Sequence, residues 1–594
     1  MRSHRLALVI AILGVVAPVN AFAQKITVKS AAPPSGAQGT INLNVKITGS
    51  GFAPGAKAEF LKSGTVDPDG IRVNTTSYVS NTELTAHIDI ADTAALSLFD
   101  IKVSAAGRSG KGTDLFRVDA KTEVCLIPES DPGHFQLVTT FNDVIAGAPR
   151  YAEYLGSSIA AAVGTIPLPA ASTRDVLIVF SGTLGTGNAE IFFVDPLSGD
   201  LLDGTSLGGG AAIQPHLSVL LPYPATAELR NTYVHRMVTA DLNLDGIPDA
   251  VTSDNGFGMV AGLLSHVNAN GQVSFTAVPF PSTGEITFGA SLAIGDVDGQ
   301  AGLEIVAIEK DQSTKRTSSP PRAFVFRLAA DKSSVELVYT LVLSALSDDN
   351  FGNTIAVGDV TGDGRPDLVG GAPYRDVNRI TDAGAVLVFP GTGAQPPYRF
   401  SATPILLTAS APVKNERLGN VVFLGNSSSD PVGQIDVIAL SEAYAAIGTV
   451  PPSRGLVFRG PVTTATKETP SDTFGPPSDP LAKGWGTAWR GTPVADLDQN
   501  GLADLIVPAS SADVTPACTF RGDVYVFFAQ ADAQGHLAGW QRATLYQPTD
   551  DAGSGSFGNA LAWVPGASLL IVGNPGFTVG GLDNAGQIYV YRVF

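Results

Sequence analysis

Residues 351–389 read FGNTIAVGDVTGDGRPDLVGGAPYRDVNRITDAGAVLVF, and this stretch decides the fold. It contains three short apolar runs, at Thr354–Val357, Leu368–Gly370 and Ala385–Phe389. Short β-branched runs bounded by Gly, Asp and Pro are typical of β-strands. The stretch therefore predicts three consecutive strands of a meander, with an acidic turn between the first two.

This acidic turn carries oxygen-bearing side chains at every second position. Asp359, Thr361 and Asp363 precede Gly364, and Asp367 closes the set. Alternating ligands with a sharp Gly bend allow one short loop to wrap its oxygens around a hard cation such as Ca²⁺. The alternative is a turn rich in Asp and Asn that caps its own backbone without a metal.

The same unit recurs along the chain. Acidic turns occur again in VTADLNLDGIPDAV, LAIGDVDGQAGLEIV and VADLDQNGLADLIV, which begin their acidic sets at Asp241, Asp296 and Asp496. Three further stretches, from Leu155, Leu418 and Phe557, carry the strand pattern with no complete acidic turn. A four-stranded sheet cannot bury both of its faces alone, so neighbouring units must stack, and radial stacking closes a β-propeller. The seven units predict a seven-bladed propeller over residues 151–594.

Composition and closure agree with an all-β fold. Only 15% of residues are charged, whereas 65 are Gly and 40 are Pro, which favours a turn-rich β protein over a helical or disordered chain. The last unit ends at Phe594 with three obvious strands, so a closed ring needs one outer strand from elsewhere. We expect the bridge at residues 119–150 to supply it through the strand-like run Phe135–Phe141.

Residues 24–118 form a separate domain of short strands. The segment ITGSGFAPGAKAEF at residues 47–60, followed by VSNTELTAHI at residues 79–88, resembles the IPT/TIG immunoglobulin-like family. The resemblance implies an Ig-like β-sandwich that serves as a spacer or binding module.

The F-G start, the D-x-D/N/T-x-D/N-G-x-x-D turn and the G-A-P after it resemble the FG-GAP repeats of integrin α-chain propellers. The resemblance implies structural Ca²⁺ in the turn between the first two strands of some blades. Carried over by position, the side-chain ligands are Asp241, Asn243, Asp245 and Asp249; Asp359, Thr361, Asp363 and Asp367; and Asp496, Asp498, Asn500 and Asp504, with backbone carbonyls from Ile247, Arg365 and Leu502. The turn with Asp296, Asp298 and Glu304 departs from the pattern because Gln300 replaces the third acid. The units at Leu155, Leu418 and Phe557 are expected to be metal-free.

The N-terminus predicts export. Arg2 and Arg5 precede the apolar run Leu6–Val19, and Ala21-Phe22-Ala23 supplies small residues at the cleavage positions, so residues 1–23 are interpreted as a signal peptide. An uncleaved anchor is the alternative. No later apolar run is long enough to span a bilayer, which leaves the mature chain extracellular, at the cell surface or in the periplasm. In an oxidising compartment Cys125 and Cys518 either form a disulfide or remain two separate thiols.

The charge pattern bears on partners. A net charge of −18 argues against nucleic acid and is compatible with divalent cations. Basic residues gather in the loops between the second and third strands of three consecutive units, at Lys315, Arg316, Arg375, Arg379 and Arg454. These loops are expected on the face opposite the acidic turns, where a basic patch would suit an anionic ligand. The alternative is solvated loop residues with no partner.

Catalytic motifs are weak. GTSLG at residues 204–208 matches a nucleophile pattern but lacks the strand-to-helix context, and the histidines have no zinc spacing. The tripeptide Arg521-Gly522-Asp523 is interpreted as the start of a strand. The sequence therefore favours recognition or adhesion of an extracellular protein or glycan. The alternatives are a propeller-based enzyme, such as a polysaccharide lyase or phospholipase, and a scaffold in a surface assembly.

Overall fold

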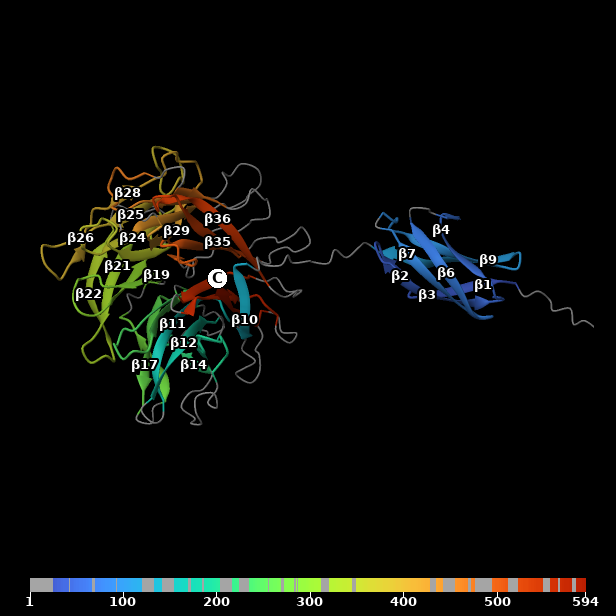
Figure 1. Cartoon of the computed structure of the whole chain (residues 1–594), viewed down its shortest axis with the longest axis horizontal. Coiled ribbons are helices and arrows are strands. Elements are labelled where there is room, and N and C mark those ends of the chain that lie inside the picture. The colour runs from blue at the N-terminus through green and yellow to red at the C-terminus, as the bar shows by residue number, and fades with distance from the viewer. Residues whose placement is uncertain are drawn as a thin grey trace, which may run out of the picture. The chain divides into compact units, whose positions relative to one another are not determined.

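The computed structural model describes residues 25–41, 43–66, 70–91, 93–119, 133–141, 154–168, 172–183, 186–202, 216–223, 234–254, 256–268, 272–281, 285, 287–310, 320–343, 349–427, 434–441, 454–467, 472–475, 494–510, 522–547, 556–564, 567–578 and 584–594. The chain divides into two compact units, Met1–Val124 and Cys125–Phe594. Every named element of the described residues is a β-strand, so the prediction of an all-β protein is confirmed (Figure 1). Within these ranges no helix has the length and apolar character needed to cross a membrane.

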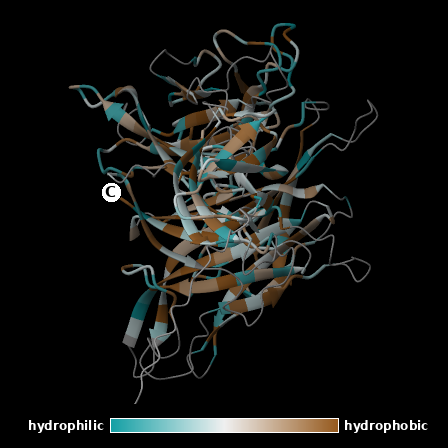
Figure 2. Cartoon of the chain, turned by 90° about the vertical axis from the view of Figure 1, so that its right-hand side faces the viewer, coloured by the Kyte–Doolittle hydropathy of each residue, from teal (hydrophilic) through white to brown (hydrophobic). Residues whose placement is uncertain are grey.

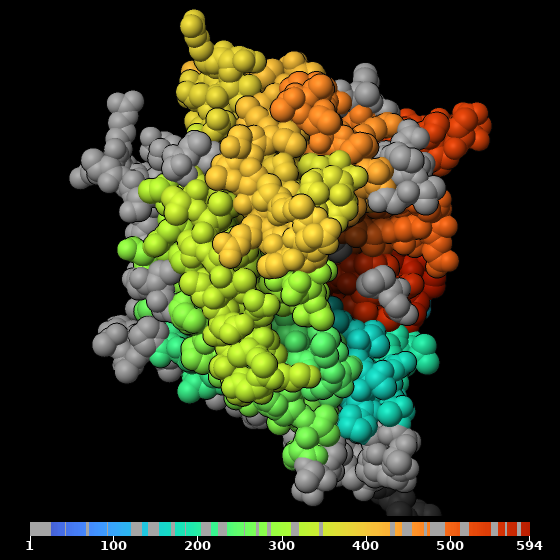
Figure 3. Space-filling view, turned by 90° about the vertical axis from the view of Figure 1, so that its left-hand side faces the viewer, coloured from blue at the N-terminus to red at the C-terminus, as the bar shows by residue number. Residues whose placement is uncertain are grey.

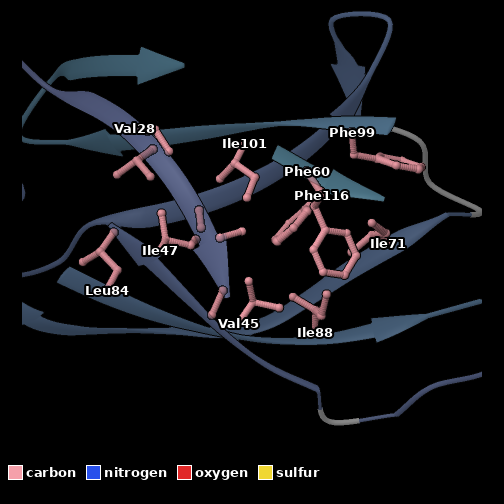
Figure 4. Packing of buried hydrophobic residues seen from close by; sticks show 14 of the residues in the cluster. Val28, Val45, Ile47, Phe60, Ile71, Leu84, Ile88, Phe99, Ile101 and Phe116 are labelled. Carbon is pink, nitrogen blue, oxygen red and sulfur yellow. The ribbon is translucent and has the colours of Figure 1, made fainter. Parts of the chain in front are cut away.

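The first unit contains two sheets that enclose one hydrophobic core (Figure 4). One sheet has the strand order β1 (Thr27–Ala32), β3 (Leu43–Ser50), β7 (Glu83–Ile90) and β6 (Ile71–Ser80). The other has the order β2 (Ser35–Ala37), β9 (Arg108–Asp119), β8 (Leu98–Ala105), β4 (Lys57–Lys62) and β5 (Thr65–Val66). Side chains of β7 alternate between buried and half-buried, which is the period-two pattern of a strand with one face on the core. Phe60 and Phe116 pack edge to face at 5.2 Å in this core.

The second unit contains seven four-stranded antiparallel sheets, which we number along the chain. Sheet 1 comprises β11 (Ile159–Leu168), β12 (Ser172–Gly182), β13 (Asn188–Val194) and β14 (His216–Leu220). Sheet 2 comprises β15 (Arg236–Ala240), β16 (Asp249–Asp254), β17 (Met259–Val267) and β18 (Val273–Pro279). Sheet 3 comprises β19 (Phe288–Gly295), β20 (Glu304–Glu309), β21 (Arg322–Leu328) and β22 (Val335–Val342).

Sheet 4 comprises β23 (Ile355–Gly358), β24 (Asp367–Ala372), β25 (Ala385–Phe389) and β28 (Ile405–Leu407), beside the small ribbon β26 (Gly391–Thr392) and β27 (Arg399–Phe400). Sheet 5 comprises β29 (Leu418–Gly425), β30 (Asp436–Ser441), β31 (Gly455–Phe458) and β32 (Thr473–Phe474). Sheet 6 comprises β33 (Val494–Ala495), β34 (Asp504–Ala509), β35 (Asp523–Ala531) and β36 (Leu537–Tyr546). Sheet 7 comprises β37 (Ala560–Val564), β38 (Leu569–Asn574), β39 (Gln587–Val593) and β10 (Phe135–Phe141).

Sheet 7 joins two distant parts of the chain. Strand β10, from the bridge, pairs antiparallel with β39 near the C-terminus, with Phe135 opposite Val593 and Phe141 opposite Ile588. It occupies the edge position that the three C-terminal strands leave open, which is the position expected for a bridge strand. The side chain of Phe135 is buried in the hydrophobic cluster that sheets 6 and 7 share.

Hydrophobic clusters connect each sheet to the next. Clusters lie between sheets 1 and 2, 2 and 3, 3 and 4, 4 and 5, 5 and 6, and 6 and 7. A further cluster joins sheet 7 back to sheet 1, through Ile571 and Val590 against Leu177 and Val179. The contacts therefore close a ring of sheets. Figure 2 shows hydrophobic residues concentrated on the strands and hydrophilic ones on many of the connecting loops.

The F-G pair at the start of the inner strands has a backbone explanation. The glycine that follows the buried Phe or Leu has a positive φ of 80–84° in five sheets, at Gly156, Gly289, Gly352, Gly419 and Gly558. This left-handed conformation strongly favours glycine. The glycines of the G-A-P segment allow neighbouring sheets to approach closely, because a Cβ atom at Gly371 would lie 1.7 Å from the carbonyl oxygen of Gly419.

The closing strand provides the first prediction. Phe135→Ala removes a buried ring from the cluster between sheets 6 and 7, so we expect it to lower the free energy of unfolding of the ring by about 3–5 kcal/mol. Hydrogen exchange followed by mass spectrometry should show loss of protection in β10 together with β39. Gln136→Ala is the matched control, because Gln136 is exposed in the same strand and should change stability by less than about 0.5 kcal/mol. Unchanged protection of β39 in Phe135→Ala would show that the ring does not depend on β10.

Candidate metal centres

The four acidic turns occupy equivalent positions in four sheets. They connect β15 to β16, β19 to β20, β23 to β24, and β33 to β34, which are the first and second strands of sheets 2, 3, 4 and 6. Because each turn follows the end of an inner strand, all four lie at the same end of the ring.

The last carboxylate of each turn is the first residue of the second strand and is fully buried. In sheet 4, Oδ2 of Asp367 accepts hydrogen bonds from the backbone N–H groups of Val360 and Thr361, both at 2.9 Å. Its Oδ1 accepts the N–H of Gly391, which follows the third strand, at 2.8 Å. One carboxylate therefore ties the first hairpin to the end of the third strand, and we call it the closing carboxylate.

The other sheets repeat this arrangement. Asp249 accepts the N–H of Leu242 at 2.8 Å and that of Ser265 at 2.7 Å, and Asp504 accepts those of Leu497 at 2.7 Å and Ala529 at 2.8 Å. Glu304 accepts the N–H groups of Val297 at 2.9 Å and Asp298 at 3.3 Å. The closing carboxylate thus holds the hairpin in every sheet that carries an acidic turn.

Sheet 5 contains a closing carboxylate that the sequence reasoning missed. Asp436 accepts the N–H of Ser427 at 2.9 Å and the N–H of Gly460 at 2.9 Å, and it is fully buried. The signal was present, because Asp436 directly precedes the second apolar run of its unit, as Asp367 does. This unit was expected to be metal-free, so the closing carboxylate occurs apart from a complete acidic turn.

Burial opposes the negative charge of these groups. It raises the pKa of Asp249 to about 6 and that of Asp504 to about 7, although the backbone N–H donors act in the opposite direction. The pKa of Asp367 is also raised by burial. Burial is again the main cause for Glu304, whose pKa is raised further by the negative charges of Asp298 and Asp296. A cation beside these carboxylates would favour the charged form.

The leading carboxylate of each turn caps its own turn, and Asp296 does so by accepting the N–H of Gly299 at 2.7 Å. Asp359 accepts the N–H groups of Gly362 and Gly364, each at 2.8 Å. Asp241 accepts that of Gly246 and Asp496 accepts that of Gly501, both at 2.9 Å. These are the bonds of the capped turn considered above as the alternative to a metal loop, and they hold the loops in shape.

Carboxylate oxygens converge in two of the turns. One oxygen from each member of the sets Asp496, Asp498 and Asp504, and Asp296, Asp298 and Glu304, lies within 4.8 Å of the others. The turn in sheet 3, which departs from the sequence pattern, is therefore as compact as the regular turn in sheet 6. Asp298 is 1% exposed, and its Oδ2 lies 3.7 Å from Nη1 of Arg327.

In the turns of sheets 2 and 4, a side-chain N–H group contacts the third residue of the acidic set. Asn243 donates from Nδ2 to Oδ2 of Asp245 at 3.2 Å, and its own Oδ1 accepts the N–H of Asp245. The guanidinium group of Arg365 pairs with Asp363. Of the three predicted carbonyl ligands, that of Ile247 accepts the hydroxyl of Ser265 at 3.3 Å, while Leu502 is a buried residue of the sheet 6 turn.

Two of the five predicted basic residues are balanced by acids. Arg375 pairs with Asp349, and Nε of Arg454 lies 2.5 Å from Oε1 of Glu416, whose side chain is 2% exposed. These two arginines therefore do not form an uncompensated basic patch. Arg379 is exposed, whereas Lys315 and Arg316 lie outside the described residues.

The remaining candidates are placed as follows. Asp523 of the Arg-Gly-Asp tripeptide is the first residue of β35 and is 4% exposed, so its carboxylate is not displayed to solvent. Cys125, Cys518 and Ser206 lie outside the described residues.

Comparisons with known proteins agree with the repeat. Residues 351–389 match the FG-GAP repeat family, and this match covers β23, β24 and the turn between them. The chain is 31% identical to mouse integrin α-IIb over 237 residues and 34% identical to human integrin α-IIb over 172 residues. These alignments cover 38% and 27% of the chain, but only 20% and 15% of the integrins. The chain thus spans about a fifth or less of the relatives that it matches.

Among solved structures, the chain is similar to a putative phosphatase from Bacteroides thetaiotaomicron, with a TM-score of 0.30, 9% identity, and coverage of 96% of this chain and 98% of that one. It is also similar to the NanB sialidase of Streptococcus pneumoniae, with a TM-score of 0.32, 11% identity, and coverage of 93% and 83%. At these TM-scores the likeness carries no argument about function.

Sheet 5 allows a test of the closing carboxylate apart from a complete acidic turn. Asp436→Asn replaces one acceptor oxygen with an N–H₂ group that faces backbone donors. We expect it to lower the free energy of unfolding by about 1–3 kcal/mol. The loss should be the same with calcium and with excess chelator in chemical denaturation. Ser427→Ala is the matched control, because it removes the hydroxyl that donates to Asp436 at 2.9 Å and leaves both backbone bonds in place. Wild-type stability in Asp436→Asn would contradict the structural role.

Proposed function

We propose that the second unit is a seven-bladed β-propeller of the FG-GAP type and that the first is an Ig-like β-sandwich. Seven four-stranded sheets with cyclic contacts support the propeller, and the FG-GAP match falls on the inner strands of sheet 4. The two packed sheets of the first unit, with their common core, support the sandwich. The boundaries that we propose are 24–118 for the sandwich, 119–150 for the bridge and 151–594 for the propeller.

We further propose that the acidic turns bind Ca²⁺ and that the metal is structural. The observation that carries this proposal is the recurrence of acidic turns at the same hairpin of four sheets, two of them with three converging carboxylates. Carboxylate oxygens on a turn with a Gly bend suit a hard cation. A cation would offset the mutual repulsion of three carboxylates and the desolvation of the closing one. The sheet 3 and sheet 6 turns are the strongest candidates.

The protein is proposed to act outside the cell in recognition or adhesion of a protein or glycan. The predicted signal peptide and the similarity to an integrin α chain support this role. With the metals at one end of the ring, the loops at the other end are free to contact a ligand. These loops include the turn Asn378-Arg379, where both residues have positive φ and the flanking Val377 and Ile380 exchange backbone hydrogen bonds.

Calcium should stabilise the ring. If each site binds with a Kd of about 0.1–1 mM, then about 1 mM calcium adds on the order of 0.4–1.4 kcal/mol per site to the free energy of unfolding. We expect excess chelator to lower the melting temperature and calcium to restore it. The double variant Asp496→Asn with Asp498→Asn should reduce the calcium-dependent rise in melting temperature by the contribution of the sheet 6 site.

Asp331→Asn is the matched control for the calcium measurement. Asp331 is an exposed aspartate that caps the turn between β21 and β22 by accepting the N–H of Ser333 at 3.0 Å. Its substitution should leave the calcium-dependent shift intact. A wild-type melt that is identical in calcium and in chelator would refute the metal sites.

A glycan and protein array tests the recognition role. We expect saturable binding to at least one extracellular ligand, weakened by Arg379→Ala. Because the metals are proposed to be structural, chelation well below the calcium-free melting temperature should leave that binding intact. Loss of binding on chelation at every temperature would instead indicate a metal-bridged ligand, and an array without any ligand would contradict the role.

A further inference from the structure

A cavity of about 290 Å³ lies at the centre of the ring. Its walls come from the first strands of sheets 1 to 6 and the residues next to them, and these strands face one another across the ring axis. Its volume is close to the lower end of the range of small-molecule pockets. Figure 3 shows one face of the ring, where the surface is hollowed between segments coloured cyan, green, gold and red.

The two ends of the cavity differ in chemistry. Ser158, Arg236 and Thr354 lie at or just before the starts of β11, β15 and β23, and they form a polar end. This end is opposite the acidic turns, which follow the ends of β15, β19, β23 and β33. Most of the remaining wall is apolar and includes Val357 and Leu424.

Arg236 is held rigidly at the polar end. Its side chain spans from sheet 2 to sheet 4, where Nη2 donates to the carbonyl oxygen of Asn353 at 3.0 Å, and Nη1 donates to that of His235 at 3.3 Å. Asn353 is fixed in turn, because its Nδ2 donates to Oδ1 of Asn420 in sheet 5 at 2.9 Å. Arg236 is 7% exposed, so its guanidinium group lies largely away from bulk solvent. Its hydrogen bonds fix the orientation of this group before any ligand binds.

A second cation lies nearby. The Nζ of Lys310 donates to Oδ1 of Asn353, the residue that also accepts from Arg236. Burial, and to a smaller extent the positive charge of Arg236, lower the pKa of Lys310 to about 7, so this amine is only partly charged near neutral pH. The guanidinium group of Arg236 is therefore the permanently charged group of the polar end.

Ser158 supplies an independent observation. It lines the cavity, it is 1% exposed, and its Oγ has no hydrogen-bond partner within the described parts of the chain. Buried hydroxyl groups are nearly always satisfied by protein, water or a ligand. Its Oγ lies buried beside Gly182, so a rotation of this side chain toward the cavity would allow a polar atom of a bound molecule to complete the hydroxyl group.

We propose that the cavity binds a short aliphatic carboxylate, with its carboxylate at the polar end near Arg236 and Ser158 and its chain against Val357 and Leu424. A guanidinium group matches the planar, bidentate geometry of a carboxylate, and the aliphatic wall removes a hydrocarbon chain from water. The site needs neither the calcium turns nor the outer loops, so it goes beyond the recognition role proposed above and is independent of it.

Calorimetric titration of the full chain with hexanoate tests the site. We expect saturable binding of hexanoate and at least tenfold weaker binding of hexan-1-ol, which lacks the charge, and of acetate, which lacks the chain. Arg236→Met should weaken hexanoate binding at least tenfold, and Ser158→Ala should weaken it to a smaller extent. Arg399→Met, which removes an exposed arginine outside the channel, is the matched control and should bind as the wild type does.

A second variant keeps the test decisive if Arg236→Met does not fold. Ala356 lines the cavity, so Ala356→Phe fills it and leaves Arg236 in place. This variant should lose hexanoate binding and keep its calcium-dependent melting shift. Absence of saturable hexanoate binding in the wild type would overturn the proposal and leave a water-filled channel. Equal binding of acetate or inorganic phosphate would also overturn it, in favour of a site for small anions alone.

Discussion

The second unit depends on a buried carboxylate placed at the same point of five sheets. Asp249, Glu304, Asp367, Asp436 and Asp504 each begin a second strand and accept backbone N–H groups from the hairpin before it. In four of them the other oxygen accepts an N–H group from near the end of the third strand or just beyond it. Removing a carboxylate from water lowers the stability of the folded state unless the carboxylate is hydrogen-bonded, and the backbone N–H groups supply these bonds. The closing carboxylate fixes the first hairpin of each of these sheets relative to the third strand. The turn of that hairpin therefore has the same geometry from sheet to sheet.

This constant geometry bears on the proposed metal binding by the turns. Once the closing carboxylate and the Asp-capped backbone set the loop, the remaining acids need little movement to converge. In sheet 6 the converged set has three carboxylates, and in sheet 4 the guanidinium group of Arg365 takes the place beside Asp363 that a cation would otherwise favour. The sheet 5 hairpin keeps the tie, and its unit lacks the acidic sequence. Hairpin geometry and the convergence of acidic side chains are therefore separable properties of the same loop, and the first does not require the second.

Much of the ring follows from local sequence, since the strands are short β-branched runs between Gly, Asp and Pro. The place of Phe135–Phe141 in sheet 7 follows from counting the strands left over at the end. The convergence in the Asp296 turn does not follow, because it depends on a backbone path through Gly299 and Gly302, both with positive φ, and not on residue spacing. The neutralisation of Arg454 by Glu416 is also hidden, since 37 residues separate the partners along the chain and only the pairing of β29, β30 and β31 within sheet 5 brings them together. Side-chain pairs of this kind depend on loop conformation and on strand pairing, and local sequence patterns specify neither.

The ring also separates its acidic turns from Arg236. The inner strands run in the same direction in every sheet. Residues that precede these strands therefore gather at one end of the ring, and residues that follow them gather at the other end. Acids follow the strands, whereas Arg236 and Lys310 lie beside strand starts, and Asn353 connects these two cations to sheet 5. A chain with a net charge of −18 thereby places Arg236 at one end of the central cavity and its acidic turns at the other end of the ring. Charge repulsion alone would not produce this separation, because it arises from repeating one meander around a closed ring.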